Sequence, residues 1–513
     1  MFSRFALTPS SLPPSFQKLA LRATGAGRGR SLALISDSTA QNNPAAFDMA
    51  RQLAEDGWKV TFLDLAPPSQ KTAPPAQQVF AYERLAGLYR ETNWYVPLQA
   101  LGVYHWLREK KFDFVLWQHG FGTGYYAGMA RKLGLAFQDT AFVIHACEPF
   151  ALRLEQAMKF PSGYTDMETD FLERETMAMA DAVLCTTMDT ADWLVAAGWA
   201  FPRNVAALDD GKDASAWGAW LDKITPSHHG KTATEPVSIS VCMAIYNRPV
   251  LLREALNSLT GQSLAAFELI VIDDGSTDKK VEELRQEFAP LFKSRGWRWE
   301  TRPNAGPSAA RNYAASLAKS THLLFMDDDN IAYPDELERF SAAAARGCDI
   351  LSCVIGLHPD SDMSFPPTAH MPERSGGATR PVGWPPLGNA LGLAPFINKF
   401  GETNSLFRRE VFEALGGFQG DRDMMFEDFD VFIRASIAGY RIDVVPEVLL
   451  LYRRHKASRS MGPTIFRSHI DTLKPIAALL PPALRPLLLT LRHEWYERHC
   501  QRRDGSKDEA SKH

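Results

Sequence analysis

Two series of short apolar segments alternate with helical segments, and this alternation constrains the fold of the chain more than any other feature. The first series comprises SLALI (31–35), KVTFL (59–63), FDFVLW (112–117), AFVI (141–144) and AVLCT (182–186). Strands that are separated by helices of ten or more residues pair in parallel, because each crossover helix returns the chain to the same edge of the sheet. The series therefore predicts a Rossmann-like α/β domain over residues 31–207.

A second series begins at Val237 and predicts another α/β domain, over residues 237–455. Its strands are VSISVCMAI (237–245), FELIVIDD (267–274), HLLFMDDD (322–329) and RIDVVP (441–446). The first of these has large apolar residues at every second position, with small residues between them, as in a strand buried on both faces. Between residues 356 and 400, eight prolines and six glycines leave no helical or strand periodicity, which predicts a long lid or binding loop.

The remaining segments lie at the two ends and between the predicted domains. Residues 1–30 carry basic but no acidic side chains, so a transit peptide, a membrane-surface segment and a disordered basic tail all stay open. Residues 208–236 are rich in turn-forming residues and predict a linker. Residues 456–503 predict a helical extension whose leucine-rich part, 473–492, either lies on a bilayer or packs on the protein. Residues 504–513 predict a disordered tail.

The composition excludes several classes of protein. Apolar residues make up 45% and charged residues 23% of the 513 residues, as in soluble globular proteins. With 60 acidic and 56 basic side chains, the formal charge of −4 gives no chain-wide electrostatic attraction for nucleic acid. The chain has no run of eighteen apolar residues, so no transmembrane helix is predicted. The six cysteines include no C-x-x-C pair, which argues against structural zinc, and their scatter favours a reducing compartment.

Polar residues follow three strands of the second domain, where ligands of open α/β sheets bind. They are Tyr246-Asn247, then Asp273-Asp274 at the start of DDGSTD, then DDDN at 327–330. DDGSTD by itself is equally typical of a turn that caps the next helix. DDDN is either a solvated acidic turn or a cation site, because Asp327 and Asp329 point the same way in an extended chain and offer oxygen ligands to Mg²⁺ or Mn²⁺.

The segment NAGPSAARNYAA, from Asn304, predicts a turn that runs into a helix, with Arg311 in its first turns. A helix N-terminus with an arginine nearby is a natural place for a phosphate. The alternative is a surface arginine on an ordinary helix.

These segments, in the order Tyr246-Asn247, DDGSTD, NAGPSAARN, FMDDDN and FEDFDVFIRASIAGYRIDVVPE, resemble glycosyltransferase family 2 over residues 237–455. The resemblance implies the GT-A fold for nucleotide-diphosphate sugars. It implies that Tyr246 lies against the nucleotide base, that Asp274 hydrogen-bonds the base and that Asp273 supports the loop. The resemblance also places Arg311 near the diphosphate and Asp328 among the residues that bind the donor.

The same resemblance implies the chemistry. Asp327 and Asp329 would form the D-x-D pair that holds Mg²⁺ or Mn²⁺ against the diphosphate, although Asn330 stands where the family usually has another aspartate. Asp428 would be the general base on the acceptor hydroxyl, and Glu427 would orient it or touch the acceptor. A single displacement with one base inverts the anomeric configuration. His455 either reaches the metal or phosphate, as a histidine does in some relatives, or lies on the surface in a basic segment.

The first domain resembles, over residues 31–207, the amino-terminal half of a GT-B glycosyltransferase of the family 4 type. The half that binds the nucleotide sugar in such enzymes is missing here, so this domain is expected to bind acceptor glycan, a partner or the second domain rather than to catalyse transfer.

The expected function is transfer of a sugar from a nucleotide-diphosphate donor, with a UDP-sugar as the commonest case, to a glycan or lipid-linked acceptor in surface polysaccharide or glycan biosynthesis. The expected place is the cytoplasm, with peripheral contact to the inner membrane face and no nucleic-acid partner. The alternative is a non-catalytic nucleotide-sugar-binding scaffold of a glycan assembly complex. Retention of both Asp329 and Asp428 favours the enzyme, because a binder has little need of a base.

Overall fold

The computed structural model describes residues 17–18, 29–36, 44–65, 79–85, 96–118, 120–207, 220–226, 237–359, 369–372, 379–420, 424–453 and 465–492. The chain divides into two compact units, and each is considered by itself. Met1–Gly230 with Thr368–Thr379 form the first unit, and Lys231–Pro367 with Arg380–His513 form the second. Most of the predicted linker, the predicted tail 504–513 and His455 lie outside the described residues.

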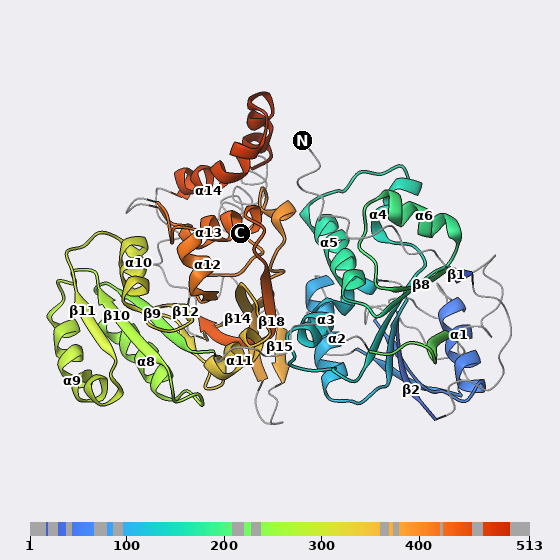
Figure 1. Ribbon diagram of the computed structural model, residues 1–513, viewed down its shortest axis with the longest axis horizontal. Helices are drawn as coiled ribbons and strands as arrows, with labels where there is room; N and C mark the ends of the chain where they lie inside the picture. Colours follow the sequence, from blue (N-terminus) through green and yellow to red (C-terminus); the bar gives the residue numbers. More distant parts are fainter. Residues whose placement is uncertain are drawn as a thin grey trace, which may run out of the picture. The chain divides into compact units, whose positions relative to one another are not determined.

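The first unit contains one sheet in which all paired strands run parallel (Figure 1). Its strand order is β1-β8-β7-β6-β5-β2-β3-β4. The strands are β1 (Gln17–Lys18), β2 (Ser31–Ser36), β3 (Lys59–Asp64), β4 (Ala81–Arg84), β5 (Phe114–Trp117), β6 (Ala141–Ala146), β7 (Ala182–Cys185) and β8 (Asn204–Ala207). The prediction of a Rossmann-like parallel sheet in this part of the chain is confirmed.

Helices cover this sheet, and apolar residues fill the space on both of its faces. The helices are α1 (Pro44–Glu55), α2 (Val96–Arg108), α3 (Tyr125–Lys132), α4 (Phe150–Gln156), α5 (Tyr164–Ala178) and α6 (Met188–Ala196). One cluster of buried residues surrounds Trp117, and another contains Phe47 and Phe62. Alternate residues of the same strands enter the two clusters, as expected for a parallel sheet that is covered on both sides.

The second unit contains a mixed sheet. Its main strand order is β11-β10-β9-β12-β17-β14-β16, and β18 pairs with β13 and β14. Its strands are β9 (Ile239–Ile245), β10 (Glu268–Asp273), β11 (Arg298–Thr301), β12 (His322–Asp327), β13 (Ile331–Ala332), β14 (Ile350–Leu357), β16 (Thr379–Trp384), β17 (Leu406–Arg408) and β18 (Ile442–Tyr452). The short strand β15 (Ala369–Pro372) belongs to the segment that is counted with the first unit. The first four strands in this order pair in parallel, so the predicted α/β class is confirmed here too.

The register of these parallel strands brings the polar strand ends together. Asp273 is paired with Ile245, and Asp327 is paired with Ala244. Tyr246, Asp274 and Asp328 therefore leave the sheet at the same edge and at nearly the same level. The helices of this unit are α8 (Pro249–Thr260), α9 (Lys279–Arg295), α10 (Pro307–Leu317), α11 (Glu336–Ala344), α12 (Arg409–Ala414), α13 (Glu427–Ile437) and α14 (Ile465–Leu479).

The segment 356–400 differs from the prediction of a loop without strands. It contains β15 and β16, and Val382 of β16 is fully buried. β16 pairs with β14 through an irregular register at Ile355 and Gly356. A Cβ on Gly356 would lie 2.8 Å from the carbonyl oxygen of Leu450, so the close approach of backbones needs glycine there. The glycines and prolines that permit this irregular pairing also remove the periodicity by which a strand is recognised.

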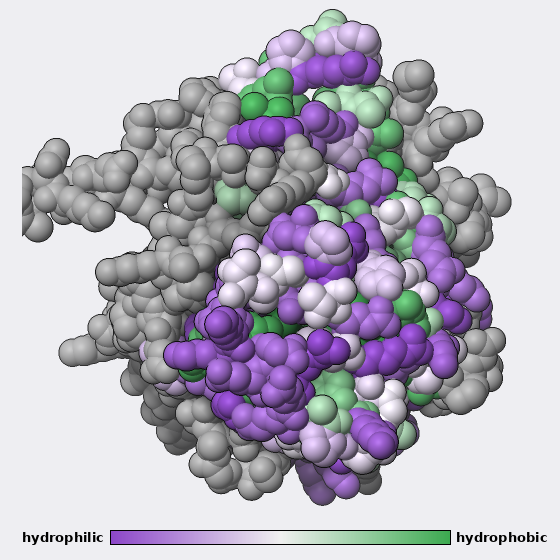
Figure 2. Space-filling view, turned by 90° about the vertical axis from the view of Figure 1, so that its left-hand side faces the viewer, coloured by the Kyte–Doolittle hydropathy of each residue, from purple (hydrophilic) through white to green (hydrophobic). Residues whose placement is uncertain are grey.

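The carboxyl-terminal segment is helical and has two faces. Leu473 and Leu488 are buried, and an Nη1 donor of Arg492 bonds the carbonyl of Phe396. Leu484, Leu487 and Leu491 are 42–59% exposed. At the top of Figure 2, this segment shows hydrophilic and apolar residues side by side. None of the described helices is long and apolar enough to cross a membrane.

Candidate active site

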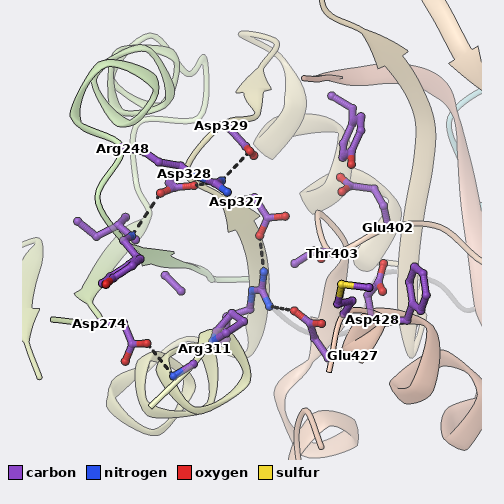
Figure 3. A pocket seen from close by; sticks show the side chains of 18 of the residues that line it. Arg248, Asp274, Arg311, Asp327, Asp328, Asp329, Glu402, Thr403, Glu427 and Asp428 are labelled. Atoms are coloured by element: carbon purple, nitrogen blue, oxygen red, sulfur yellow. Dashed lines mark hydrogen bonds and ion pairs between the residues drawn. The ribbon is translucent and has the colours of Figure 1, made fainter. Parts of the chain in front are cut away.

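A pocket of about 700 Å³ lies at the edge of the second sheet where the parallel strands end (Figure 3). Its walls come from the residues after β9, β10 and β12, the start of α10, the loop before β17 and the start of α13. The lining includes seven carboxylic acids and two arginines: Asp274, Asp327, Asp328, Asp329, Glu402, Glu427, Asp428, Arg248 and Arg311. This excess of acid makes the pocket unusual, because like charges at short range are unfavourable unless cations or protons neutralise them.

Arg311 links the end of β12 to the start of α13. Its Nη2 donates to Asp327 Oδ1 at 2.5 Å, and its Nη1 donates to Glu427 Oε1 at 2.5 Å. Only 7% of the side chain is exposed. Burial by itself lowers the pKa of Arg311, but the two carboxylates outweigh this effect and raise the pKa. The guanidinium is therefore a fixed positive charge between two elements, and this bidentate use leaves little of it for a ligand.

Arg248 neutralises the other two aspartates of the acidic run. Its Nη1 donates to Asp328 Oδ1 at 3.1 Å and to Asp329 Oδ2 at 2.8 Å. Asp328 is buried and also accepts a long hydrogen bond from the backbone amide of Tyr246. Burial raises the pKa of Asp328 to about 7, although Arg248 opposes that effect. The acidic run is thus tied to the end of β9.

The turn after β10 is held by the side chains of one aspartate and one asparagine. Asp273 Oδ1 accepts from the amide of Ser276 at 2.8 Å, which is the supporting contact expected of it. Asn247 has a positive φ of 54° and accepts from the amides of Thr277 and Asp278 at 2.7 and 2.9 Å. These contacts fix the position of the DDGSTD segment against the end of β9.

Asp274 contacts the backbone next to the start of α10. Its two carboxylate oxygens accept from the amides of Ala305 at 3.0 Å and Gly306 at 2.8 Å. The residue lines the pocket, so a third acceptor position on the carboxylate remains for a ligand. Tyr246 is 42% exposed and also lines the pocket, as a residue that stacks on a base must.

Asp428 and Glu402 form an acidic wall on one side of the pocket, away from Arg248 and Asp274 (Figure 3). Burial, followed by the charge of Glu427, raises the pKa of Asp428 to about 7. Burial and the charge of Asp327 raise the pKa of Glu402 well above its usual range. A carboxylate whose pKa is near neutrality can accept a proton from a bound hydroxyl and hold it.

Every predicted site residue except His455 and Asp273 lines this one pocket, and His455 lies outside the described residues. Arg248, Glu402 and Tyr452 also line it and were not predicted from the sequence. Arg248 follows Tyr246-Asn247 directly, so its place at a strand end was the available signal. Glu402 and Tyr452 had no signal in the sequence, because they reach the pocket through non-local pairing of β17 and β18.

The carboxylates fit a hard divalent cation only if the phosphate groups of a bound ligand complete the coordination of the cation. Asp327 and Asp329 lie two residues apart and line the pocket with oxygen ligands. Among the residues that the structure describes, no group of three or more acidic, histidine or cysteine side chains forms a ready metal site. Mg²⁺ and Mn²⁺ commonly take one or two carboxylates together with substrate phosphates and water, and this arrangement matches that pattern.

The fold and the pocket define a class: an α/β domain with an acidic pocket beyond the carboxyl ends of its parallel strands. Residues 240–416 match the family model described as glycosyl transferase family 2, and residues 45–206 match the model described as glycosyltransferase family 4. The second α/β unit of this chain is thus similar to glycosyltransferase family 2 over residues 240–416, and the first unit is similar to family 4 over residues 45–206.

Several proteins and solved structures are similar to parts of this chain. An uncharacterised glycosyltransferase of Haemophilus influenzae is 37% identical over 106 residues, which are 20% of this chain and 40% of that protein. An uncharacterised glycosyltransferase of Methanocaldococcus jannaschii is 27% identical over 42% of this chain and 70% of that protein. The crystal structure of residues 1–349 of Staphylococcus aureus TarS with UDP-GlcNAc is 18% identical, with a TM-score of 0.38, over 51% of this chain and 73% of that one. This chain thus spans less than half the length of the Haemophilus relative.

Proposed function

We propose that this protein is an inverting, metal-dependent glycosyltransferase that moves a sugar from a nucleotide-diphosphate sugar to a hydroxyl of a glycan or lipid-linked acceptor. A UDP-sugar is the first donor to test. The observation that carries the proposal is one pocket, in the family 2 domain, that combines an exposed tyrosine, an acidic run and a buried carboxylate of raised pKa. Each of these has a separate task in such a reaction.

The donor's nucleoside lies at the end of the pocket where Tyr246 and Asp274 line it. Tyr246 stacks on the base, and Asp274 accepts a hydrogen bond from the base with the lone pair that its two backbone contacts leave. Asp273 and Asn247 hold the turn between them. The rigid turn means that the donor-binding groups need no rearrangement when the nucleotide enters.

The acceptor hydroxyl lies beside Asp428. The acceptor oxygen forms a bond to the anomeric carbon as the bond from that carbon to the diphosphate oxygen breaks. The hydroxyl proton moves to Asp428, and the nucleoside diphosphate leaves with the bonding electron pair. Attack on the face opposite the leaving group inverts the configuration. Glu427 stays paired with Arg311 and fixes the first turn of α13, which carries Asp428.

Asp327 and Asp329 would hold Mg²⁺ or Mn²⁺, with Asp328 buried between them. When bound, the cation supplies neutralisation of the charge that develops on the leaving diphosphate. The carboxylates themselves disfavour an uncompensated diphosphate, so donor binding without a cation is expected to be weak.

The test of this proposal is calorimetric binding of a nucleotide-sugar panel, with and without Mn²⁺, to the wild type and to Asp329→Ala. We expect one class of nucleotide sugar to bind in the presence of Mn²⁺ and to lose most of its affinity in the variant. Glu283→Gln is the matched control, because Glu283 is exposed on α9 outside the pocket. If the folded wild type binds no member of the panel with metal present, the proposal is wrong.

The alternative is a scaffold that binds the donor without transferring it. The retained Asp428 favours the enzyme, since its raised pKa suits a base and contributes nothing to binding a neutral sugar. Donor hydrolysis or transfer by the wild type, and its loss in Asp428→Asn with unchanged donor affinity, separates the two functions.

We further propose that the biological setting is surface polysaccharide or glycan biosynthesis in the cytoplasm. The exposed leucines of the carboxyl-terminal segment that follows α14 would then lie at the inner membrane face. The support is the exposure of Leu484, Leu487 and Leu491 beside Arg485, which suits the interface of an anionic bilayer. For the first domain we propose a binding role toward acceptor or partner, because the family 4 match spans residues 45–206 alone.

A further inference from the structure

Arg248 stands at the entrance to α8 and faces the pocket. It is the residue immediately before the helix, and its backbone φ and ψ are −134° and 57°. The turn therefore carries its side chain back over the end of the sheet, where it lines the pocket with 27% of its surface exposed. Figure 3 shows it lying across the acidic run, next to Asp328 and Asp329.

The guanidinium of Arg248 uses only one of its three nitrogens in these contacts. Both printed ion pairs, to Asp328 and Asp329, come from Nη1. Among the described residues, Nη2 and Nε have no hydrogen-bond acceptor. Since guanidinium has five donors in a planar fork, three of them remain available on a side chain that lines the pocket.

Arg311, the other arginine in the pocket, differs in this respect. Both of its terminal nitrogens donate to carboxylates, Asp327 and Glu427, and its Nε is buried without a partner. The ring of Phe418 lies beside the guanidinium of Arg311, with its centroid 5.6 Å from Cζ. Arg311 therefore has little surface to offer to a phosphate, although the sequence placed it near the diphosphate.

Charge supports the same distinction. Among the residues that the structure describes, the pocket lining contains seven carboxylic acids and two basic residues, Arg248 and Arg311. The guanidinium of Arg248 is charged, as arginine is throughout the pH range of proteins. A diphosphate that enters this acidic site needs positive charge, and of these two arginines Arg248 is the one with open donors.

We propose that Arg248 binds a phosphate of the donor diphosphate through Nη2 and Nε while Nη1 stays on Asp328 and Asp329. Arg311 is then a positioning residue that ties Asp327 to Glu427. The inference rests on the proposed function, since it assigns the phosphate contact of that same donor site. Charge-assisted bidentate contacts of this kind are the usual way in which arginine recognises phosphate.

The experiment compares binding of UDP, UMP and uridine to the wild type, Arg248→Gln and Arg248→Lys, at saturating Mn²⁺. A charged hydrogen bond contributes enough that its loss is expected to weaken UDP binding about 10- to 100-fold. Uridine binding should not change, and UMP should fall between. Arg253→Gln is the control, because Arg253 lies one turn further along α8 and pairs with Glu287 on the surface. It should bind UDP as the wild type does.

Binding of Mn²⁺ alone, followed by calorimetry, separates phosphate contact from a purely structural role. If Arg248 acted only by holding Asp328 and Asp329, the glutamine variant would weaken the binding of Mn²⁺ alone by the same factor as the binding of UDP, and the proposal would be overturned. Arg248→Lys keeps the charge that neutralises the aspartates but lacks the fork, so it should fold and still lose UDP affinity. Equal UDP affinity of the wild type and a folded Arg248→Lys would also overturn the proposal. The three probes carry the nucleoside of whichever nucleotide sugar binds in the panel, with uridine as the first case, and if no member of the panel binds, the proposed function fails together with this inference.

Discussion

At the scale of single residues, the environment of Asp428 predicts a pH dependence of transfer. Burial and the neighbouring charge of Glu427 raise its pKa to about 7, and only the deprotonated carboxylate accepts the acceptor's proton. We therefore expect kcat to rise with pH up to about 7 and then to level off. A cation bound at Asp327 and Asp329 would stabilise the carboxylate form of Asp428 and move the rise in kcat to lower pH. Initial rates between pH 5 and 9 in one buffer series test the expectation, and a flat profile over that range would contradict it.

The same residue gives a sharper prediction by substitution. Asp428→Asn keeps the size of the side chain and the acceptor oxygen for the amide of Phe429, which the carboxylate binds at 2.7 Å. It removes the base, so kcat should fall by about 10²- to 10⁴-fold while the donor dissociation constant stays within about twofold. Steady-state rates and calorimetry measure the two quantities. A loss of donor affinity equal to the loss of rate would place Asp428 in donor binding instead.

The location of the candidate site residues, though not their roles, was partly predictable from the sequence. Tyr246, Asp274 and the acidic run line one pocket, because strand ends of a parallel sheet meet at one edge. The contact partners were not predictable. The sequence indicates that Arg311 lies near a helix start, but not that Asp327 and Glu427 already occupy it. Those pairs depend on side chains that are 16 and 116 residues distant in the chain.

At the scale of elements, α11 begins with a buried acid that should make stability depend on pH. Glu336 is fully buried, and burial raises its pKa from 4.5 to about 8. The folded protein therefore keeps the proton over a range in which the unfolded chain loses it. The contribution of Glu336 to the free energy of unfolding is greatest below pH 4.5. It falls as the pH rises towards 8 and then levels off. The loss should amount to a few kcal/mol at most.

Glu336→Gln tests this dependence, because glutamine does not titrate and keeps the oxygen that accepts from Asn404. We expect the free energy of unfolding of the variant to fall less than that of the wild type between pH 5 and 8. Chemical denaturation at several pH values gives the two slopes. Glu338→Gln, on the exposed side of the same helix, should keep the wild-type slope. Parallel slopes for the wild type and Glu336→Gln would show that the carboxyl does not titrate in this range.

The elements themselves were predictable where their periodicity was regular. The strands that became β2, β3, β5, β6 and β7, and those that became β9, β10 and β12, agree with the predicted runs to within a few residues. β18 continues to Tyr452, well past the predicted end at residue 446. Pro446 lies where the pairing of β14 and β18 skips two residues, so the proline marks a bulge within the strand instead of its end.

At the scale of the whole molecule, the order of segments predicted two α/β units because each series of strands has its own helices. The comparisons agree with one family in each series. The order of segments does not show which apolar side chains pack inward and which stay on the surface. A leucine-rich segment can pack inward or face a membrane, and the sequence left both open. The structure shows that Leu473 and Leu488 of this segment pack on the protein, while Leu484, Leu487 and Leu491 stay exposed.

The exposed leucines predict reversible binding to anionic membranes. Leu484, Leu487 and Leu491 recur at spacings of three and four residues, so they share one face of the helical segment, with Arg485 exposed nearby. Their replacement by serine removes apolar area that would otherwise enter the bilayer interface, and should weaken binding to anionic vesicles about 10-fold or more. The buried Leu488 keeps the segment on the protein, so folding should be little affected.

Vesicle co-sedimentation of the full chain measures this binding, with anionic and with zwitterionic lipid. A matched control replaces Met158 and Phe160, which are 93% and 92% exposed in the first unit, with serine. Both variants reduce exposed apolar surface, but only the leucine variant should lose affinity for the vesicles. Because Arg485 adds an electrostatic attraction, the wild type should bind less well at high salt. Equal binding of the wild type and the leucine variant would mean that the exposed face does not contact lipid, and that any acceptor on a membrane reaches the pocket without this segment.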